Sequence, residues 1–150
     1  KEKLVIAAES SILCPSNFSQ MAISSYLADQ PWRDQIREFC KLYKERRDAM
    51  LESLEKYFPA EATWTRPEGG FYVWVTLPPE IDTKALMPKA IVAKVAYVPG
   101  TAFYADVFGS WSMRLSYCHP TPDRIRKGVK ALGGVIKQEM ERRGIGQIGN

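Results

Sequence analysis

One stretch of the sequence places an arginine where it could bind a carboxylate. Residues 111–117 (WSMRLSY) alternate apolar and polar side chains, which is the period of a strand buried on one face. On the polar side, Arg114 stands between Ser112 and Ser116, so its long guanidinium has little bulk beside it. The fork of N–H donors matches a planar carboxylate in two-pronged geometry. The alternative is a solvent-facing strand on which Arg114 pairs with a neighbouring acid.

The residue types that bind metals do not form a recognisable metal site. Cys118 and His119 are adjacent, but no second pair of ligands completes a four-ligand zinc set. The three cysteines, Cys14, Cys40 and Cys118, are far apart and odd in number. Because no secretory signal accompanies them, they predict reduced thiols and a cytoplasmic location. We therefore expect no metal.

The composition is typical of a globular domain with its own core. The chain has 150 residues, of which 45% are hydrophobic and 25% charged. The net charge of +4 is modest, and basic residues alternate with acidic ones, as in residues 44–48 (KERRD), so nucleic acid is not an expected partner. No apolar run reaches the roughly 20 residues of a membrane helix, so no membrane is expected either. Residues 1–8 have the pattern of a helix interior without a starting methionine, which suggests a fragment or a processed product.

Three helices are predicted in the first part of the chain. The helix over residues 1–12 ends at Cys14, because a residue before proline avoids the helical region. Asn17, with Gln20 three residues later, has the form of a capping box for a second helix. Residues 31–58 form the longest helix, which opens on a proline. At about 1.5 Å per residue it is longer than a small domain needs, as is typical of a helix that connects two domains.

Three strands are predicted in the second part. Residues 67–70 (PEGG) form a turn, and residues 71–77 (FYVWVTL) show the clearest alternation of the sequence. A short strand is expected over residues 95–98, followed by a loop rich in aromatic residues at 101–109. The strand that carries Arg114 comes next.

Helices separate these strands and close the chain. Asp82 caps a helix that Pro88 kinks or restarts, and Thr121 caps the last helix. The apolar face of that helix consists of Ile125, Val129, Leu132, Ile136 and Met140. The order strand, helix, strand, strand, helix predicts an α/β fold of the α+β type. We expect a short, mainly antiparallel sheet covered by helices and preceded by the long helix.

Four segments in this order resemble one enzyme family. The segments are residues 67–74 (PEGGFYVW), 97–104 (YVPGTAFY), 113–117 (MRLSY) and 121–125 (TPDRI). This series closely resembles the C-terminal third of fold-type I, pyridoxal-phosphate-dependent aminotransferases of class I/II, and the 2-aminoadipate and kynurenine aminotransferase-like branch is nearest. The resemblance extends over residues 1–140 and implies a parent enzyme that moves an amino group between an amino acid and a 2-oxo acid.

The resemblance also implies how the chain is divided. Residues 1–30 match the tail of the large domain that binds pyridoxal phosphate, and residues 31–58 match the interdomain helix. Residues 59–143 match the C-terminal small domain. Residues 144–150 are expected to be a flexible tail, because the end of the chain is rich in glycine.

Four residues match functional positions of the family. Arg114 matches the arginine that holds the substrate's α-carboxylate. Tyr72 matches an aromatic position of the substrate pocket, although sheet packing explains it equally well. Ser16 and Asn17 match a segment that approaches the partner's active site in family dimers, so a homodimer is expected. Helix capping is the simpler explanation for these two residues.

The lysine that binds the cofactor has no match in this chain. The family's Schiff-base lysine, the aspartate that pairs with the pyridine nitrogen and most phosphate ligands correspond to positions upstream of residue 1. We therefore expect no catalytic and no cofactor-binding residue here, no covalently bound pyridoxal phosphate and no transaminase activity of the chain alone.

Two other functions remain open. The first is a transcriptional regulator in which an aminotransferase-like domain senses an amino acid or the cofactor, because its C-terminal part would look similar. The second is a stand-alone binding module. Against the second, the long helix is expected to expose apolar residues such as Ile36, Met50 and Leu54, which would promote self-association.

Overall fold

The chain folds into two compact units whose boundary falls inside one helix. The computed structural model describes residues 1–106 and 108–146. The first unit spans residues 1–40 and the second begins at residue 41, within helix α3 (Trp32–Tyr57). The predicted tail lies partly outside the described residues, because residues 147–150 are not among them.

The first unit contains α1 (Glu2–Ile12), α2 (Asn17–Asp29) and the first turns of α3. The helices lie close to their predicted positions, but the cap of α2 differs from the prediction. Ser16, not Asn17, is the N-cap, and its side chain accepts a hydrogen bond of 3.3 Å from the backbone N–H of Ser19. Asn17 is already the first helical residue, because the cap position falls directly after Pro15. No residue of α1 or α2 is buried.

The second half of α3 belongs to the core of the second unit. Met50 is 4% exposed and Leu54 is fully buried, so the expectation that both would be exposed is wrong. Ile36 lies outside that unit's boundary and is 49% exposed, as expected. The error arose because helical spacing identifies an apolar stripe but not how much of its length is covered.

The sheet is short and antiparallel, as predicted, and it has four strands in the order β1-β2-β4-β3. The central pair is β2 (Tyr72–Thr76) and β4 (Ser112–Ser116). β1 (Thr63–Trp64) was not predicted, because two residues are too short to show a period. β3 is Val98–Pro99 and not residues 95–98, since the N–H of Val95 bonds to the carbonyl of Ala90 at the end of a helix.

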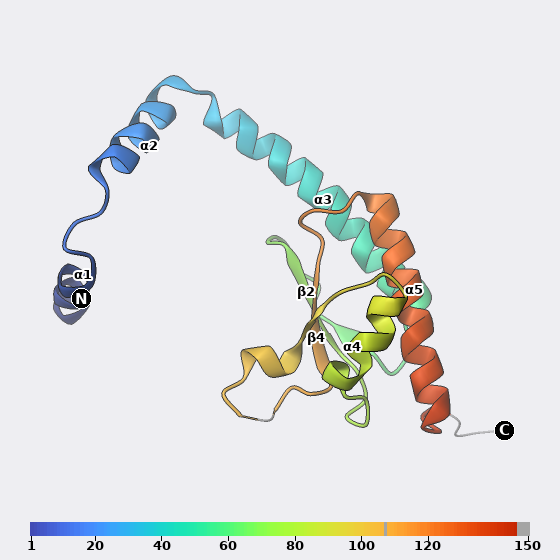
Figure 1. Ribbon diagram of the computed structural model, residues 1–150. Coiled ribbons are helices and arrows are strands. Elements are labelled where there is room, and N and C mark those ends of the chain that lie inside the picture. The colour runs from blue at the N-terminus through green and yellow to red at the C-terminus, as the bar shows by residue number, and fades with distance from the viewer. Residues whose placement is uncertain (107, 147–150) are drawn as a thin grey trace. The chain divides into compact units, whose positions relative to one another are not determined.

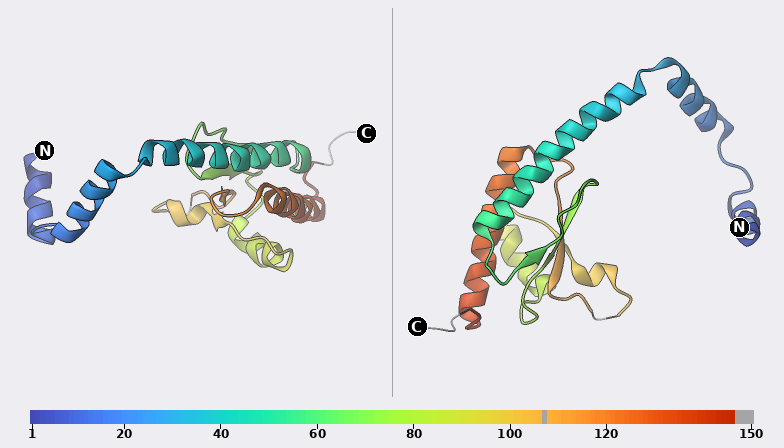
Figure 2. Two further views of the ribbon diagram at one scale, coloured as in Figure 1. Left: turned by 90° about the horizontal axis from the view of Figure 1, so that it is seen from above. Right: turned by 180° about the vertical axis from the view of Figure 1, so that it is seen from behind.

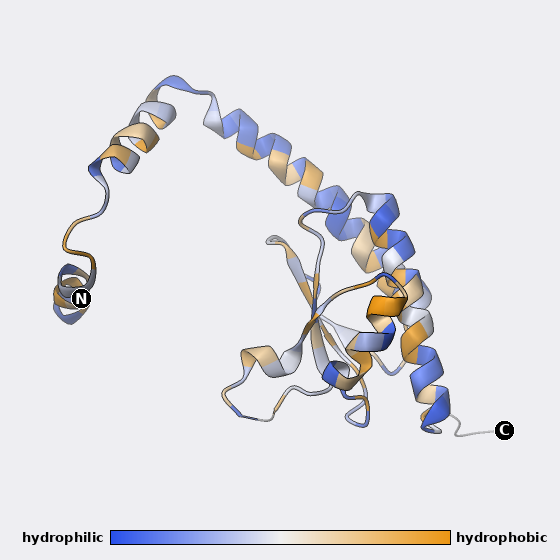
Figure 3. Ribbon diagram, in the orientation of Figure 1, coloured by the Kyte–Doolittle hydropathy of each residue, from blue (hydrophilic) through white to orange (hydrophobic). Residues whose placement is uncertain are grey.

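Two more helices complete the second unit. α4 (Thr83–Val92) begins at its Asp82 cap and continues through Pro88, and its C-terminal end carries the strongest hydrophobic colour of the helix in Figure 3. α5 (Pro122–Arg142) begins at its Thr121 cap, and α5 runs beside the C-terminal half of α3 (Figures 1 and 2). The predicted apolar face of α5 is buried along its whole length. One core joins α3, α4 and α5 to a single face of the sheet, where Val73, Val75 and Met113 are fully buried.

A buried carboxylate joins α4 to the end of α5. Glu139 is 5% exposed and accepts hydrogen bonds from Arg142, Lys89 and Arg143, the contact with Lys89 measuring 2.6 Å. These three donors hold the pKa of Glu139 far below its usual range, with the hydrogen bonds from Arg142 contributing most. The carboxylate is therefore ionised near neutral pH and stabilises the packing of the two helices.

Candidate functional site

The face of the sheet opposite the core carries the candidate site. Successive residues of a strand point to opposite faces, so burying Val73 and Met113 turns Trp74 and Arg114 to the other side. Trp74 is directly opposite Arg114 in the β2–β4 pair. The neighbouring pair Tyr72 and Ser116 lies on the same face at the exposed end.

The Arg114 guanidinium lies between two aromatic rings. Its Cζ is 4.0 Å from the ring centroid of Tyr72 and 4.7 Å from that of Phe103. Both distances are within the range of a cation–π contact, which is attractive because the ring faces are electron-rich. Tyr72 comes from β2, and Phe103 comes from the 3₁₀ helix η1 (Gly100–Phe103). The two rings thus hold the guanidinium through cation–π contacts.

No acid among the described residues pairs with this guanidinium. Within residues 1–106 and 108–146, Arg114 forms neither an ion pair nor a side-chain hydrogen bond. The alternative in which Arg114 pairs with a neighbouring acid therefore has no support in the described part of the chain. Partly buried between two rings, the guanidinium keeps its donors available for an external carboxylate.

Two further rings extend the aromatic surface. Trp74 contacts Phe103 edge to face with 5.3 Å between centroids, and it contacts Tyr104 at 6.3 Å. Trp74, Phe103 and Tyr104 were not predicted as site residues. The signal for Trp74 was present, because it alternates in phase with Tyr72 on β2. Phe103 and Tyr104 lie in the loop that was predicted to be aromatic, but a loop pattern does not show which strand its rings contact.

Backbone contacts hold the aromatic loop at both ends. A Cβ at Gly100 would overlap the carbonyl oxygen of Gly109, so the two ends of the loop approach as closely as glycine allows. Thr83, at the start of α4, lies with its hydroxyl 2.9 and 2.7 Å from the carbonyl oxygens of Ser110 and Ser112. The loop is therefore attached to both α4 and the start of β4.

Tyr97 strengthens this attachment. Its hydroxyl donates a 2.6 Å hydrogen bond to the carbonyl oxygen of Thr83. Burial raises the pKa of Tyr97 well above its ordinary value of 10.0, so the phenol remains a neutral donor at physiological pH. The side chain that lies just before β3 thus supports the helix start that holds the loop.

The remaining predicted residues lie elsewhere. Ser16 and Asn17 belong to the first unit, where Ser16 caps α2, and their role near a partner's active site stays a prediction. In the described part of the chain, no three His, Cys, Asp or Glu residues come together in a way that could hold a metal. None of the described helices is long and apolar enough to cross a membrane.

The chain matches the family model "Aminotransferase class I and II" over residues 2–132. It is 44% identical to aromatic-amino-acid aminotransferase 1 of Thermococcus litoralis over 93% of this chain and 34% of that protein. It is also similar to the crystal structure of Pyrococcus horikoshii kynurenine aminotransferase in complex with PMP, with KYN as substrate and KYA as product. That similarity has 44% identity and a TM-score of 0.84, and it covers 93% of this chain and 34% of that chain.

A weaker similarity is to an uncharacterized HTH-type transcriptional regulator of Bacillus subtilis, 31% identical over 82% of this chain and 25% of the regulator. This chain thus spans about a third of the length of the aminotransferases that it matches. The family model covers most of the chain, and the aminotransferases are the more similar of these relatives. The chain therefore belongs to the class I and II aminotransferases.

Proposed function

We propose that this chain is the C-terminal, substrate-clamping domain of a pyridoxal-phosphate-dependent aminotransferase. The parent enzyme would move an amino group between an amino acid and a 2-oxo acid. The observation that carries the proposal is the Arg114 guanidinium, which two rings hold and no described acid neutralises. The family to which the chain belongs supports the same activity.

Arg114 is suited to fix the orientation of an amino-acid substrate. Tyr72 and Phe103 hold the guanidinium by cation–π contacts, and its N–H donors are left for a carboxylate. Two parallel N–H···O bonds from the guanidinium would restrict rotation of the carboxylate and of the carbon attached to it. Transamination breaks the Cα–H bond of the substrate, and this requires that bond to be perpendicular to the cofactor ring. A two-pronged clamp on the α-carboxylate supplies that constraint.

Arg114 of this chain is suited to bind the substrate's carboxylate, but no lysine among the described residues lies beside it on the sheet to bind the cofactor covalently. Bound pyridoxal phosphate supplies an electron sink for the carbanion that forms at the substrate's α-carbon. Every lysine lies outside the strands of the sheet and outside residues 100–111, which carry the rings beside Arg114. We infer that the Schiff-base lysine comes from another part of the parent protein and that this chain alone is inactive.

The finer roles follow from the same proposal. Tyr72 would line the substrate pocket as well as contact Arg114. Ser16 and Asn17 would approach the active site of the partner in a cytoplasmic homodimer. Residues 1–30, 31–58 and 59–143 would be the tail of the large domain, the interdomain helix and the small domain. The regulator alternative has the weaker support, because the regulator shares less identity with this chain.

The clamp is tested by Arg114→Lys in the parent enzyme. An ammonium cannot reproduce the planar fork, so kcat/KM for the amino acid should fall by about 10- to 100-fold, as expected for losing one hydrogen bond to a charged group. Arg66→Lys is the matched control, because Arg66 is exposed and pairs with Glu55 on the surface. Unchanged kinetics in the folded Arg114→Lys enzyme would remove Arg114 from the site.

A second assay tests the inactivity of the chain alone. The 150-residue chain, supplied with pyridoxal phosphate, an amino acid and a 2-oxo acid, should show no transamination above the rate of the free cofactor. Turnover that depends on folded chain would contradict the inferred position of the lysine. Peptide mapping of the native gene product upstream of residue 1 would then separate an enzyme, which carries a cofactor lysine there, from a regulator, which carries a DNA-binding segment.

A further inference from the structure

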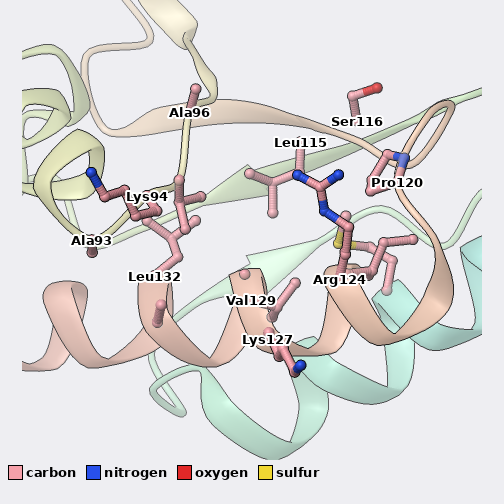
Figure 4. Close-up of a pocket in the computed structure, with 15 residues that line it drawn as sticks. Ala93, Lys94, Ala96, Leu115, Ser116, Pro120, Arg124, Lys127, Val129 and Leu132 are labelled. Carbon is pink, nitrogen blue, oxygen red and sulfur yellow. The ribbon is translucent and has the colours of Figure 1, made fainter.

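A cavity lies in the second unit, on the core side of β4. Its volume is about 410 Å³, within the range of small-molecule sites. Figure 4 shows it between α5, the strand residue Leu115 and the connection that follows α4. Its apolar part is formed by Ala96, Leu115, Val129 and Leu132. Arg114 does not line it.

All charged side chains that line this cavity are basic. They are Lys94, Arg124 and Lys127, and the lining contains no Asp or Glu. Figure 4 shows the Arg124 side chain rising from α5 toward Leu115, so its guanidinium lies over the apolar part. Within the described residues the Arg124 side chain forms no ion pair. It also lies in the first turn of α5, where the helix dipole adds positive potential.

Lys94 provides an independent observation, because its backbone is unusual. Its φ is 63°, in the left-handed region that glycine adopts most easily. The N–H of Lys94 bonds to the carbonyl of Ile91, and the N–H of Val95 bonds to that of Ala90, both at 2.9 Å. These two bonds form a Schellman motif at the C-terminal end of α4, and the left-handed residue of that motif is usually glycine. A lysine there is unfavourable for the fold, so a role for its side chain at the cavity would explain the residue.

We propose that this cavity binds a small carboxylate with an apolar body. The carboxylate pairs with the Arg124 guanidinium, and Lys94 adds positive charge elsewhere on the rim. The apolar body lies against Leu115, Val129 and Leu132. The site is separate from Arg114 and does not depend on the proposed aminotransferase function.

Ligand-observed saturation-transfer NMR on the whole chain tests the proposal with three probes. They are 4-phenylbutyrate, its neutral analogue 4-phenyl-1-butanol, and inorganic phosphate. We expect 4-phenylbutyrate to bind at least about tenfold more tightly than the alcohol, because it alone gains a charge-assisted contact. Its binding should weaken between about 0.05 and 0.5 M salt, since the basic groups are exposed and screened. Phosphate, which has no apolar body, should bind more weakly than 4-phenylbutyrate.

Variants locate the binding. Arg124→Gln should raise the dissociation constant of 4-phenylbutyrate about tenfold, as expected for losing a charged hydrogen-bond donor. Lys94→Gly should raise it about threefold while leaving the melting temperature equal or higher, because glycine suits the left-handed backbone. Arg126→Gln is the matched control on the same helix. Arg126 pairs with Asp123 and does not line the cavity.

Three results would overturn the proposal. The first is that 4-phenylbutyrate does not bind, or binds no better than the alcohol. The second is an equal effect of Arg124→Gln and Arg126→Gln, which would show only a general charge effect. The third is that neither Arg124→Gln nor Lys94→Gly changes the binding of 4-phenylbutyrate, whereas Arg114→Gln abolishes it. That result would place the carboxylate on the face of the sheet that carries Arg114.

Discussion

Two adjacent glycines in α5 allow the packing of α3 on α5 to be tested within one sequence context. Gly133 faces α3, where an added Cβ would lie 2.6 Å from the carbonyl oxygen of Tyr57 and 3.1 Å from its carbonyl carbon. A Cβ added at Gly134 would have no heavy atom within 4 Å. Alanine at either site changes the helix by the same methyl group. Only the surroundings differ.

The two substitutions should change stability in opposite directions. Alanine is favoured over glycine in a helix interior by about 1 kcal/mol, so Gly134→Ala should raise the free energy of unfolding by roughly 0.5–1 kcal/mol. Gly133→Ala gains the same propensity, but the ends of α3 and α5 must separate to relieve a contact with backbone. Overpacking of this kind costs about 1–3 kcal/mol. We expect Gly133→Ala to be the less stable variant by about 2 kcal/mol.

Urea unfolding followed by tryptophan fluorescence measures the difference, since Trp64, Trp74 and Trp111 all lie in the second unit. The free energy of unfolding must depend on the urea concentration with the same slope in both variants. A different slope would mean that the substitution has changed the unfolded or the native state. If Gly133→Ala proved as stable as Gly134→Ala, the close approach of α5 to Tyr57 would be refuted.

Two further predictions concern the same core. Glu139→Gln should lower the free energy of unfolding by about 2 kcal/mol at pH 7, because three basic donors lose a buried charged acceptor. Folding lowers the pKa of Glu139 from its ordinary value of 4.5. The ionised carboxylate therefore contributes its full stabilisation above about pH 4.5, and this contribution declines as the pH falls below that value. In acid, the free energies of unfolding of the wild-type protein and of Glu139→Gln should become equal. Leu54→Ala should cost about 2–5 kcal/mol in urea unfolding. Ile36→Ala, half exposed on the same helix, should cost under about 0.5 kcal/mol, and equal losses would contradict the burial of Leu54.

Much of the fold could be predicted from the periodicity of apolar residues and from the residues that cap helices. The alternation around Arg114 predicts which residues of β4 share a face, and Thr121 and the apolar face of α5 predict the last helix correctly. These features are local, so a single sequence contains them. β1 and the limits of β3 could not be predicted, because they depend on which distant strand or helix takes each backbone hydrogen bond.

The candidate site was predictable only where it lies on strands. Arg114 and Tyr72 could be identified from their alternation and from the family resemblance. The contact of Phe103 with Arg114 depends on how the loop returns to the sheet. That path is set by the close approach of Gly100 to Gly109 and by the hydrogen bonds of Thr83, none of which has a local period.

The two glycines at the ends of the aromatic loop also bear on how this surface could evolve. A Cβ added at Gly100 would meet the backbone of Gly109, whereas a Cβ added at Gly109 would overlap the ring of Tyr104. Tyr104 is therefore packed against Gly109 and is tied to the closure of the loop. Phe103 takes part in neither close approach, so we expect substitutions at Phe103 to alter the surface beside Arg114 while the arginine keeps its place on the sheet. The loop thus leaves one of its two rings free to diversify.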